Sequence, residues 1–439
     1  MKRLTLDRIT HVLPKLDELR PVLDHLITRS VPDPERAWTS GGELGTLGGR
    51  LVSSEDLASA VGELADAERD RTANLYVAVA EAIRCLGEGD GAGAAEALLR
   101  AASLEEGLDR PDRAEAWAAA AVRAAHEERD RRPVSLALRR QARAESAQGK
   151  LVEALNRYEE AHEIARDSLD FQGAAEAAIG AGNVLEQQGS WDDAEAWYLR
   201  ALDVMEADGR EGPETWHAQL NIHIVLRSAG SLEESLAWLT RASDSAERLG
   251  DEAATQLLEN ARGQFHMASG DFFEGERHLR AGLSAATDSK VRVPVRLNLA
   301  EALLAQNRTL EAIEEAREAE REALTQGIVT RLPEVYRILG RIFSAEDNPD
   351  AFVFFERALE IVRDRSLPAL EEALTLQAYA ESEARRGEEN SARDLHERMT
   401  QRYRALGISY TRHAWSDFYG PGPESTESKP SQHNGETDA

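Results

Sequence analysis

Groups of residues that could cradle a phosphate occur in this sequence, but each lacks part of the required pattern. Two glycine-rich stretches, 42–49 and 87–93, do not follow a recognisable strand, as a phosphate-binding loop requires. Lys150 follows a glycine, without the upstream glycine and the following Ser or Thr of a P-loop. We therefore predict no nucleotide site and no bound cofactor.

Candidate metal ligands and nucleophiles are equally incomplete. The pairs His126–Glu127 and His162–Glu163 lack the second histidine of His-Glu-x-x-His, and no Gly-x-Ser-x-Gly motif occurs. The lone cysteine, Cys85, lies near the end of a predicted helix on an apolar stripe, which favours a buried small side chain over a reactive thiol. The sequence thus predicts no metal site and no catalytic residue, and indicates that the protein is not an enzyme.

Polar side chains suited to binding without covalent chemistry recur along the chain instead. Asparagine offers both a donor and an acceptor to the backbone of an extended peptide. Arginine pairs at i,i+4 share a helix face and could anchor carboxylates or a peptide C-terminus. The candidate peptide-binding or partner-binding residues are Asn183, Asn221, Asn260, Asn298, Arg139, Arg143, Arg337 and Arg341.

The composition indicates close-packed helices and an acidic surface. The 439 residues include 52 Lys+Arg and 80 Asp+Glu, and the net charge of −28 repels a nucleic-acid backbone. Aromatic residues make up only 5%, and much of the apolar share is alanine, which favours helices over sheets. No stretch approaches the ~18 uninterrupted apolar residues of a membrane span. We expect a cytoplasmic protein that neither binds nucleic acid nor inserts into membranes.

A short turn recurs about every forty residues and organises most of the chain. A small residue lies seven positions before the turn, and others lie five and twelve positions after it. A bulky residue lies nine positions after the turn in most copies. The turn residues are Gly149, Gly189, Gly230, Gly270, Asn307, Asp347 and Gly387.

This spacing predicts antiparallel helix pairs. Small residues at matched levels let two helices approach closely, the bulky residue fills the gap between them, and Gly, Asn or Asp tolerates the positive φ that ends the first helix. One pair cannot bury its apolar face alone, so successive pairs stack into a superhelix with a concave and a convex face. The predicted fold is all-α: an α-solenoid of antiparallel helix pairs.

At these positions the sequence resembles the tetratricopeptide repeat (TPR) family. The motif residues are Leu339–Gly340 followed by Phe343, and Ala-x-x-x-Tyr at 154–158 and 194–198. The usual period is about 34 residues, so these copies are similar to a longer subtype with roughly six extra residues each. The resemblance covers about residues 133–406. It implies a right-handed superhelix whose first helices line a concave groove, a surface with which such repeats mostly bind proteins.

The resemblance also leaves simpler roles open for the candidate residues. In this family, asparagine at these levels often bonds between neighbouring repeats. The arginines could merely balance nearby glutamates such as Glu176, Glu301 and Glu381. His223 occupies one of the small positions, and we expect it to force two helices apart or to shift their register.

Outside these copies the register is lost. Ala82, Gly89 and Ala94 fit the template, so an eighth copy is predicted at about 70–105, which leaves the alanine-rich helix 112–128 without a partner. The predicted segments are an N-terminal amphipathic helical segment (1–30), a Gly/Pro-rich linker (31–52), a TPR-like α-solenoid of about eight repeats that is irregular near 106–132 (53–415), and a disordered tail (416–439).

Two functional hypotheses follow. The first is a non-enzymatic protein–protein interaction scaffold that binds a peptide or partner segment in the concave groove. The alternative is a peptide-responsive regulator of a signalling enzyme or response regulator, because such regulators resemble this plan. The Gly/Pro-rich linker and two interrupting prolines within residues 1–70 weaken the alternative.

Overall fold

The computed structural model describes residues 74–405, except 76, 80, 83–84, 86–88, 108–109, 127–129, 210, 366 and 368. The predicted N-terminal segment, linker and tail lie outside the described residues and stay predictions. The elements are α7 (Gly91–Gly107), α8 (Pro111–Ala125), α9 (Arg132–Ala147), α10 (Leu151–Asp167), α11 (Phe171–Gln187), α12 (Trp191–Asp208), α13 (Pro213–Ser228), α14 (Leu232–Leu249), α15 (Ala254–Ala268), α16 (Phe272–Ala285), α17 (Ser289–Ala305), α18 (Thr309–Gln326), the 3-10 helix η1 (Val329–Arg331), α19 (Leu332–Ala345), α20 (Ala351–Asp364), α21 (Ala369–Arg385) and α22 (Glu389–Ala405).

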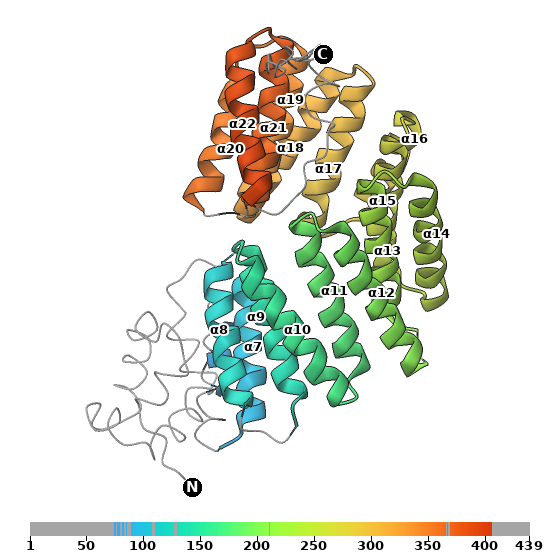
Figure 1. Cartoon of the computed structure of the whole chain (residues 1–439), viewed down its shortest axis with the longest axis vertical. Coiled ribbons are helices and arrows are strands. Elements are labelled where there is room, and N and C mark those ends of the chain that lie inside the picture. Colours follow the sequence, from blue (N-terminus) through green and yellow to red (C-terminus); the bar gives the residue numbers. More distant parts are fainter. Residues whose placement is uncertain are drawn as a thin grey trace, which may run out of the picture.

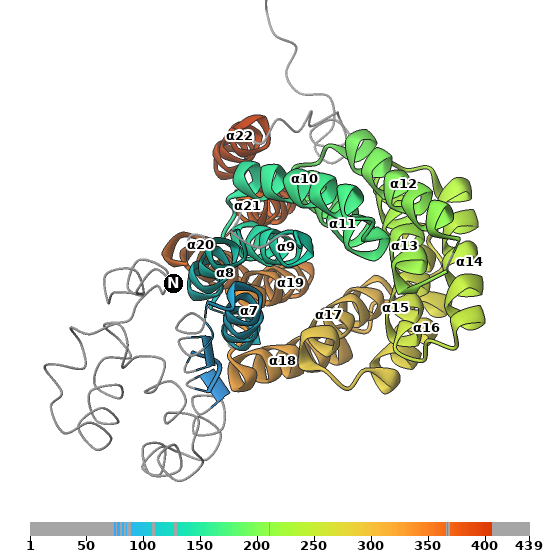
Figure 2. The same cartoon turned by 90° about the horizontal axis from the view of Figure 1, so that it is seen from below.

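These helices form antiparallel pairs that stack into a right-handed α-solenoid, as the sequence predicts. Odd-numbered helices from α7 to α21 line the inside of the superhelix and are called the inner helices, while even-numbered helices lie outside and are called the outer helices (Figure 2). Each inner helix contacts its own outer helix and the inner helix of the next repeat. Because successive inner helices lie closer to one another than successive outer helices do, the stack curves and leaves a concave inner wall.

The turns within the pairs have the predicted backbone geometry. All seven turn residues adopt a left-handed conformation, with φ between 51° at Asp347 and 86° at Gly230. Five of the seven are glycine, which adopts this conformation without steric cost, and the other two are Asn and Asp, the residues that tolerate it best. The prediction that these residues end the inner helices is confirmed.

The small and bulky positions of the repeat meet inside the pairs. A Cβ at Gly182 would overlap the Tyr198 ring, and one at Gly340 would overlap the Phe355 ring. Both rings are fully buried. The absence of a side chain on one helix thus creates the space that the aromatic ring on its partner fills, and this close approach is what the spacing predicts.

The expected distortion at His223 does not occur. Helix α14 begins two residues after its turn, as α12 does, so the register is unchanged. The fully buried imidazole instead places Nδ1 2.7 Å from the Ser235 hydroxyl oxygen, on the facing small position. Because serine is small and can hydrogen bond, it accepts the larger partner without separating the helices.

The alanine-rich helix left over in the sequence is α8, and it has a partner. It packs against both α7 and α9, so α7 and α8 form the pair that precedes α9 and α10. Three buried alanines carry the repeat register: Ala102, Ala114 and Ala121 each lie 40 residues before a counterpart in the next pair.

The solenoid completes a superhelical turn, so that later repeats lie over earlier ones. Figure 1 shows α20–α22 above α8–α10. A direct polar contact between described residues of the two turns joins Lys290 Nζ to the Glu106 carbonyl oxygen at 2.9 Å. A pocket of about 480 Å³ separates Arg110 and Lys150 on one turn from Arg365 on the other. Among the described helices, none combines the length and apolar character needed to cross a membrane.

Candidate functional site

The four candidate asparagines lie on successive inner helices, α11, α13, α15 and α17, and bond to one another in two pairs. Asn221 Nδ2 donates to Asn183 Oδ1 at 3.0 Å, and Asn298 Nδ2 donates to Asn260 Oδ1 at 2.9 Å. Asn183 Oδ1 also accepts from the Tyr198 hydroxyl at 2.8 Å. In each pair, the side-chain amide of one asparagine therefore already bonds to the asparagine of the preceding repeat. Asn183 is nevertheless exposed on the inner wall.

Three of the candidate arginines form ion pairs with glutamates on adjacent inner helices. Arg139 pairs with Glu176, and Arg341 pairs with Glu301, two of the glutamates considered from the sequence. Arg337 NH1 lies 2.9 Å from Glu371 Oε2, a glutamate that the sequence argument did not single out. These pairs hold successive inner helices together, which is a structural role.

Arg143 is the most exposed of the candidate arginines and has the weakest partner. Its Nε lies 3.8 Å from Glu106 Oε2, and 67% of its side chain is exposed. Arg140, which is not among the candidate residues predicted from the sequence, lies 3.5 Å from the same carboxylate oxygen. Both distances exceed those of good charge-assisted hydrogen bonds, so these guanidinium groups keep donors available for another acceptor.

A pocket of about 410 Å³ on the inner wall joins the candidates at the α9 and α11 helices. Arg139, Arg140 and Arg143 line it from α9, and Asn183 lines it from α11. The structure thus brings three of the eight candidate residues together, with Arg140 added. We call this the inner-wall pocket. The remaining asparagines lie on later repeats, and Arg337 and Arg341 lie on α19.

The inner-wall pocket contains one buried hydrogen-bond donor that has no acceptor among the described residues. Arg139 Nε is buried and forms no hydrogen bond, although the same guanidinium pairs with Glu176. Tyr158 lines the pocket, and burial raises the pKa of its hydroxyl to about 12, which keeps it protonated at neutral pH. Because a buried donor without an acceptor is costly, an anionic or carbonyl oxygen entering here would be stabilised.

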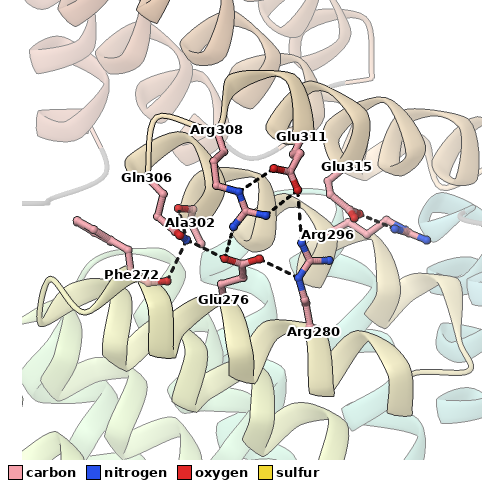
Figure 3. A network of polar contacts seen from close by, with 9 residues as sticks. All are labelled: Phe272, Glu276, Arg280, Arg296, Ala302, Gln306, Arg308, Glu311 and Glu315. Carbon is pink, nitrogen blue, oxygen red and sulfur yellow. Dashed lines mark hydrogen bonds and ion pairs between the residues drawn. The ribbon is translucent and has the colours of Figure 1, made fainter.

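A second polar arrangement, which sequence reasoning missed, joins the turns to the preceding repeat. Glu276 Oε2 accepts hydrogen bonds from Gln306 Nε2 at 3.0 Å and from Arg308 NH1 at 2.6 Å (Figure 3). The same Gln306 amide lies within hydrogen-bond distance of the Phe272 and Ala302 carbonyl oxygens. We call this arrangement the turn clamp, because it fixes a turn to the outer helix before it.

The turn clamp occurs a second time, at Lys150. Gln148 Nε2 lies 2.7 Å from Glu115 Oε2, and Lys150 Nζ lies 2.6 Å from the same oxygen. The sequence signal is a glutamine before the turn residue and a cation after it, at 148–150 and 306–308. Lys150 therefore has a structural partner in Glu115.

The part of the chain that the structure describes contains no group of three His, Cys, Asp or Glu side chains arranged to hold a metal ion. Cys85 is buried in the core formed by the first helices, as its apolar stripe predicts.

Comparison with known proteins agrees with this architecture. Residues 173–248 match the family model described as tetratricopeptide repeat. No curated protein sequence matches the chain. A Rap protein complexed with competence and sporulation factor has a TM-score of 0.56 at 14% identity, covering 89% of this chain and 99% of that one. The Rap conjugation gene regulator of the plasmid pLS20, in complex with the Phr* peptide, has a TM-score of 0.54 at 13% identity, with coverage of 79% and 96%.

At these identities the structural likeness establishes the fold. The matched stretch 173–248 falls on α11 to α14. The resemblance seen in the sequence is thereby confirmed: residues 173–248 carry tetratricopeptide repeats, and they lie within a TPR-like solenoid.

Proposed function

We propose that this TPR-like solenoid is a non-enzymatic interaction scaffold that binds an extended segment of a partner protein or peptide along its concave inner wall. The observation that carries the proposal is the inner-wall pocket, where three arginines converge and a buried Arg139 Nε lacks an acceptor. Two similar structures are peptide or signalling-factor complexes of Rap proteins, which supports a peptide-sized occupant. A cytoplasmic location is part of this proposal.

An acidic side chain or C-terminal carboxylate of the segment occupies the inner-wall pocket in this proposal. Arg143 and Arg140 reach it as charged donors, because their common partner Glu106 is too distant to satisfy both. The segment then continues past Asn183 and Asn221, whose amides can exchange their mutual bond for bonds to its backbone. The peptide-responsive regulator hypothesis stays a prediction, because the N-terminal segment that it requires lies outside the described residues.

Affinity capture with charge-reversal variants tests this proposal. We expect Arg143→Glu to reduce recovery of a specific partner at least about tenfold, because a carboxylate would then face a carboxylate. A triple change of Asn221, Asn260 and Asn298 to Ala should also reduce it while helical circular dichroism is unchanged. Arg363→Glu on the outer helix α20, exposed and without an ion pair to a described residue, is the matched control. Equal recovery with all variants would exclude the inner wall as the binding surface.

A further inference from the structure

A third pocket, of about 460 Å³, lies between the outer helices α10 and α12, beside the start of α11. We call it the outer-wall pocket. Arg166 from α10 and Arg200 from α12 line it, together with the apolar side chains of Leu169, Phe171 and Val204. Its volume lies in the range of small-molecule sites, and its lining combines an apolar surface with a few convergent polar groups, as such sites do.

The two arginines of the outer-wall pocket have no acidic partner within the part of the chain that the structure describes. Neither Arg166 nor Arg200 forms an ion pair with a described residue, although acidic residues outnumber basic ones by 80 to 52 in the chain. Asp203 lies in the lining but pairs with neither. Both positive charges act on the same buried imidazole: burial lowers the pKa of His162, and Arg166 and Arg200 lower it further. The arginines therefore converge on one place.

Trp197 holds Arg200 in position. The Arg200 guanidinium carbon lies 4.4 Å from the centre of the Trp197 ring, and the His162 ring meets that indole edge-on at 5.5 Å. A guanidinium stacked on an aromatic face keeps its donor edges free for an acceptor in the ring plane. Arg200 is thus oriented by stacking and not by a carboxylate, which leaves its bidentate edge unused.

Leu169 adds an independent observation. It has a left-handed backbone (φ 53°), where the corresponding residues after α12, α14 and α18 are Gly209, Gly250 and Gly327. Its side chain is 74% exposed, so burial does not compensate for the strained conformation. A strained, exposed leucine at a position otherwise occupied by glycine is explained when the side chain contacts a ligand.

We propose that the outer-wall pocket binds a small organic anion. Arg166 and Arg200 bind its anionic group, a carboxylate or a phosphate monoester, and Leu169, Phe171 and Val204 cover its apolar body. The site is separate from the inner-wall pocket, because the two pockets share no lining residue, and α10 and α12 are outer helices (Figure 2). The scaffold would then carry a metabolite site that is independent of its partner groove.

Fluorescence titration with anilinonaphthalene sulfonate, an apolar organic anion, tests the proposal on the full chain. We expect Arg200→Glu and Arg166→Glu each to weaken dye binding at least about tenfold, the loss of one charge-assisted contact. The matched control is Arg241→Glu, because Arg241 stacks on Trp238 in the next outer helix at 4.5 Å but does not line the outer-wall pocket. Equal affinity of all three variants and the unmodified protein would overturn the proposal.

Leu169→Gly separates loss of the site from loss of the fold. Glycine relieves the left-handed strain, so this variant should melt at the same or a higher temperature and yet bind the dye more weakly. Unchanged dye affinity would contradict the role assigned to Leu169.

Competition defines the ligand class. Phenylpropionate and phenyl phosphate should both displace the dye, and the one that displaces it at lower concentration identifies the anionic group. Phenylpropanol, which lacks the charge, and inorganic phosphate, which lacks the apolar body, should not displace it at the same concentrations. Displacement by inorganic phosphate as effective as by phenyl phosphate would refute the organic class, and displacement by phenylpropanol would refute the role of the arginines.

Discussion

His223 shows how one residue type can break the repeat pattern without breaking the fold. The ring is fully buried and is held by Ser235, which lies at the facing small position. Burial, with the charge of Arg227 adding to it, lowers the pKa of His223 to about 4. The imidazole is therefore neutral in the folded protein at neutral pH.

The lowered pKa predicts acid sensitivity with a defined window. In the unfolded chain a histidine takes up a proton near pH 6.5, whereas folded His223 does so only near pH 4, so stability falls as the pH drops from 6.5 to 4. The full loss is on the order of 3 kcal/mol. We expect His223→Gln, which keeps a neutral polar group, to remove that part of the pH dependence in urea unfolding curves at pH 7 and pH 4.5. The same acid-induced loss in both proteins would show that other groups cause it.

At the residue scale, the sequence locates the candidate side chains but not their partners. Their spacing relative to the turns places Asn183 and Asn221 on successive inner helices, and the structure has them there. It does not determine which rotamers meet, since Arg139 reaches Glu176 while Arg143, four residues on, remains largely exposed. The inner-wall pocket depends on these rotamers and on Tyr158 from an outer helix, so no local pattern reveals it.

The helix pairs are fixed at their turns by more than backbone conformation. In the turn clamp, Glu276 has only 13% of its side chain exposed and accepts from Gln306, Arg308 and Arg280. Burial raises the pKa of Glu276, but the hydrogen bonds from those three side chains outweigh it and hold the pKa below its usual value. The carboxylate thus ties α16 to the turn between α17 and α18.

Neutralising this carboxylate is predicted to weaken the junction between the two repeats. Glu276→Gln keeps the shape but loses the charge that three donors share, and we expect a loss of about 1–2 kcal/mol. The matched control is Glu318→Gln, because Glu318 forms an exposed pair with Arg321 and its removal should change stability by less than about 0.5 kcal/mol. Urea midpoints measured at pH 7 compare the two. Equal effects would mean that the turn clamp is no stronger than an exposed ion pair.

Element positions were the most predictable feature, because turn residues and small residues leave a periodic signal. The exception is the α7–α8 pair, where Gly89 suggests a different register. The buried alanines Ala102, Ala114 and Ala121 carry the correct register. In an alanine-rich stretch small residues occur at almost every level, so their positions alone do not distinguish the two registers.

The whole molecule is an acidic superhelix. Few polar contacts between described residues join its successive turns. Acidic residues exceed basic ones by 28, and many of the arginines on the inner wall are used between repeats. Like charges on successive superhelical turns repel one another, and the hydrogen bond from Lys290 to the Glu106 carbonyl is a small force against that repulsion. The pitch of the superhelix should therefore change with ionic strength more readily than the packing within the helix pairs does.

Ionic strength is the direct way to change that balance. The screening length falls from about 30 Å at about 0.01 M salt to below about 10 Å at about 0.5 M, which removes repulsion between turns but leaves buried contacts in place. We expect the radius of gyration from small-angle X-ray scattering to decrease over this range while helical circular dichroism stays constant. Lys290→Ala should enlarge the radius at low salt, because it removes the contact between the turns, whereas Arg321→Ala, with an exposed side chain on α18, should not. A radius that is independent of both salt and Lys290 would mean that close contact between apolar and neutral surfaces, and not charge, sets the pitch of the superhelix.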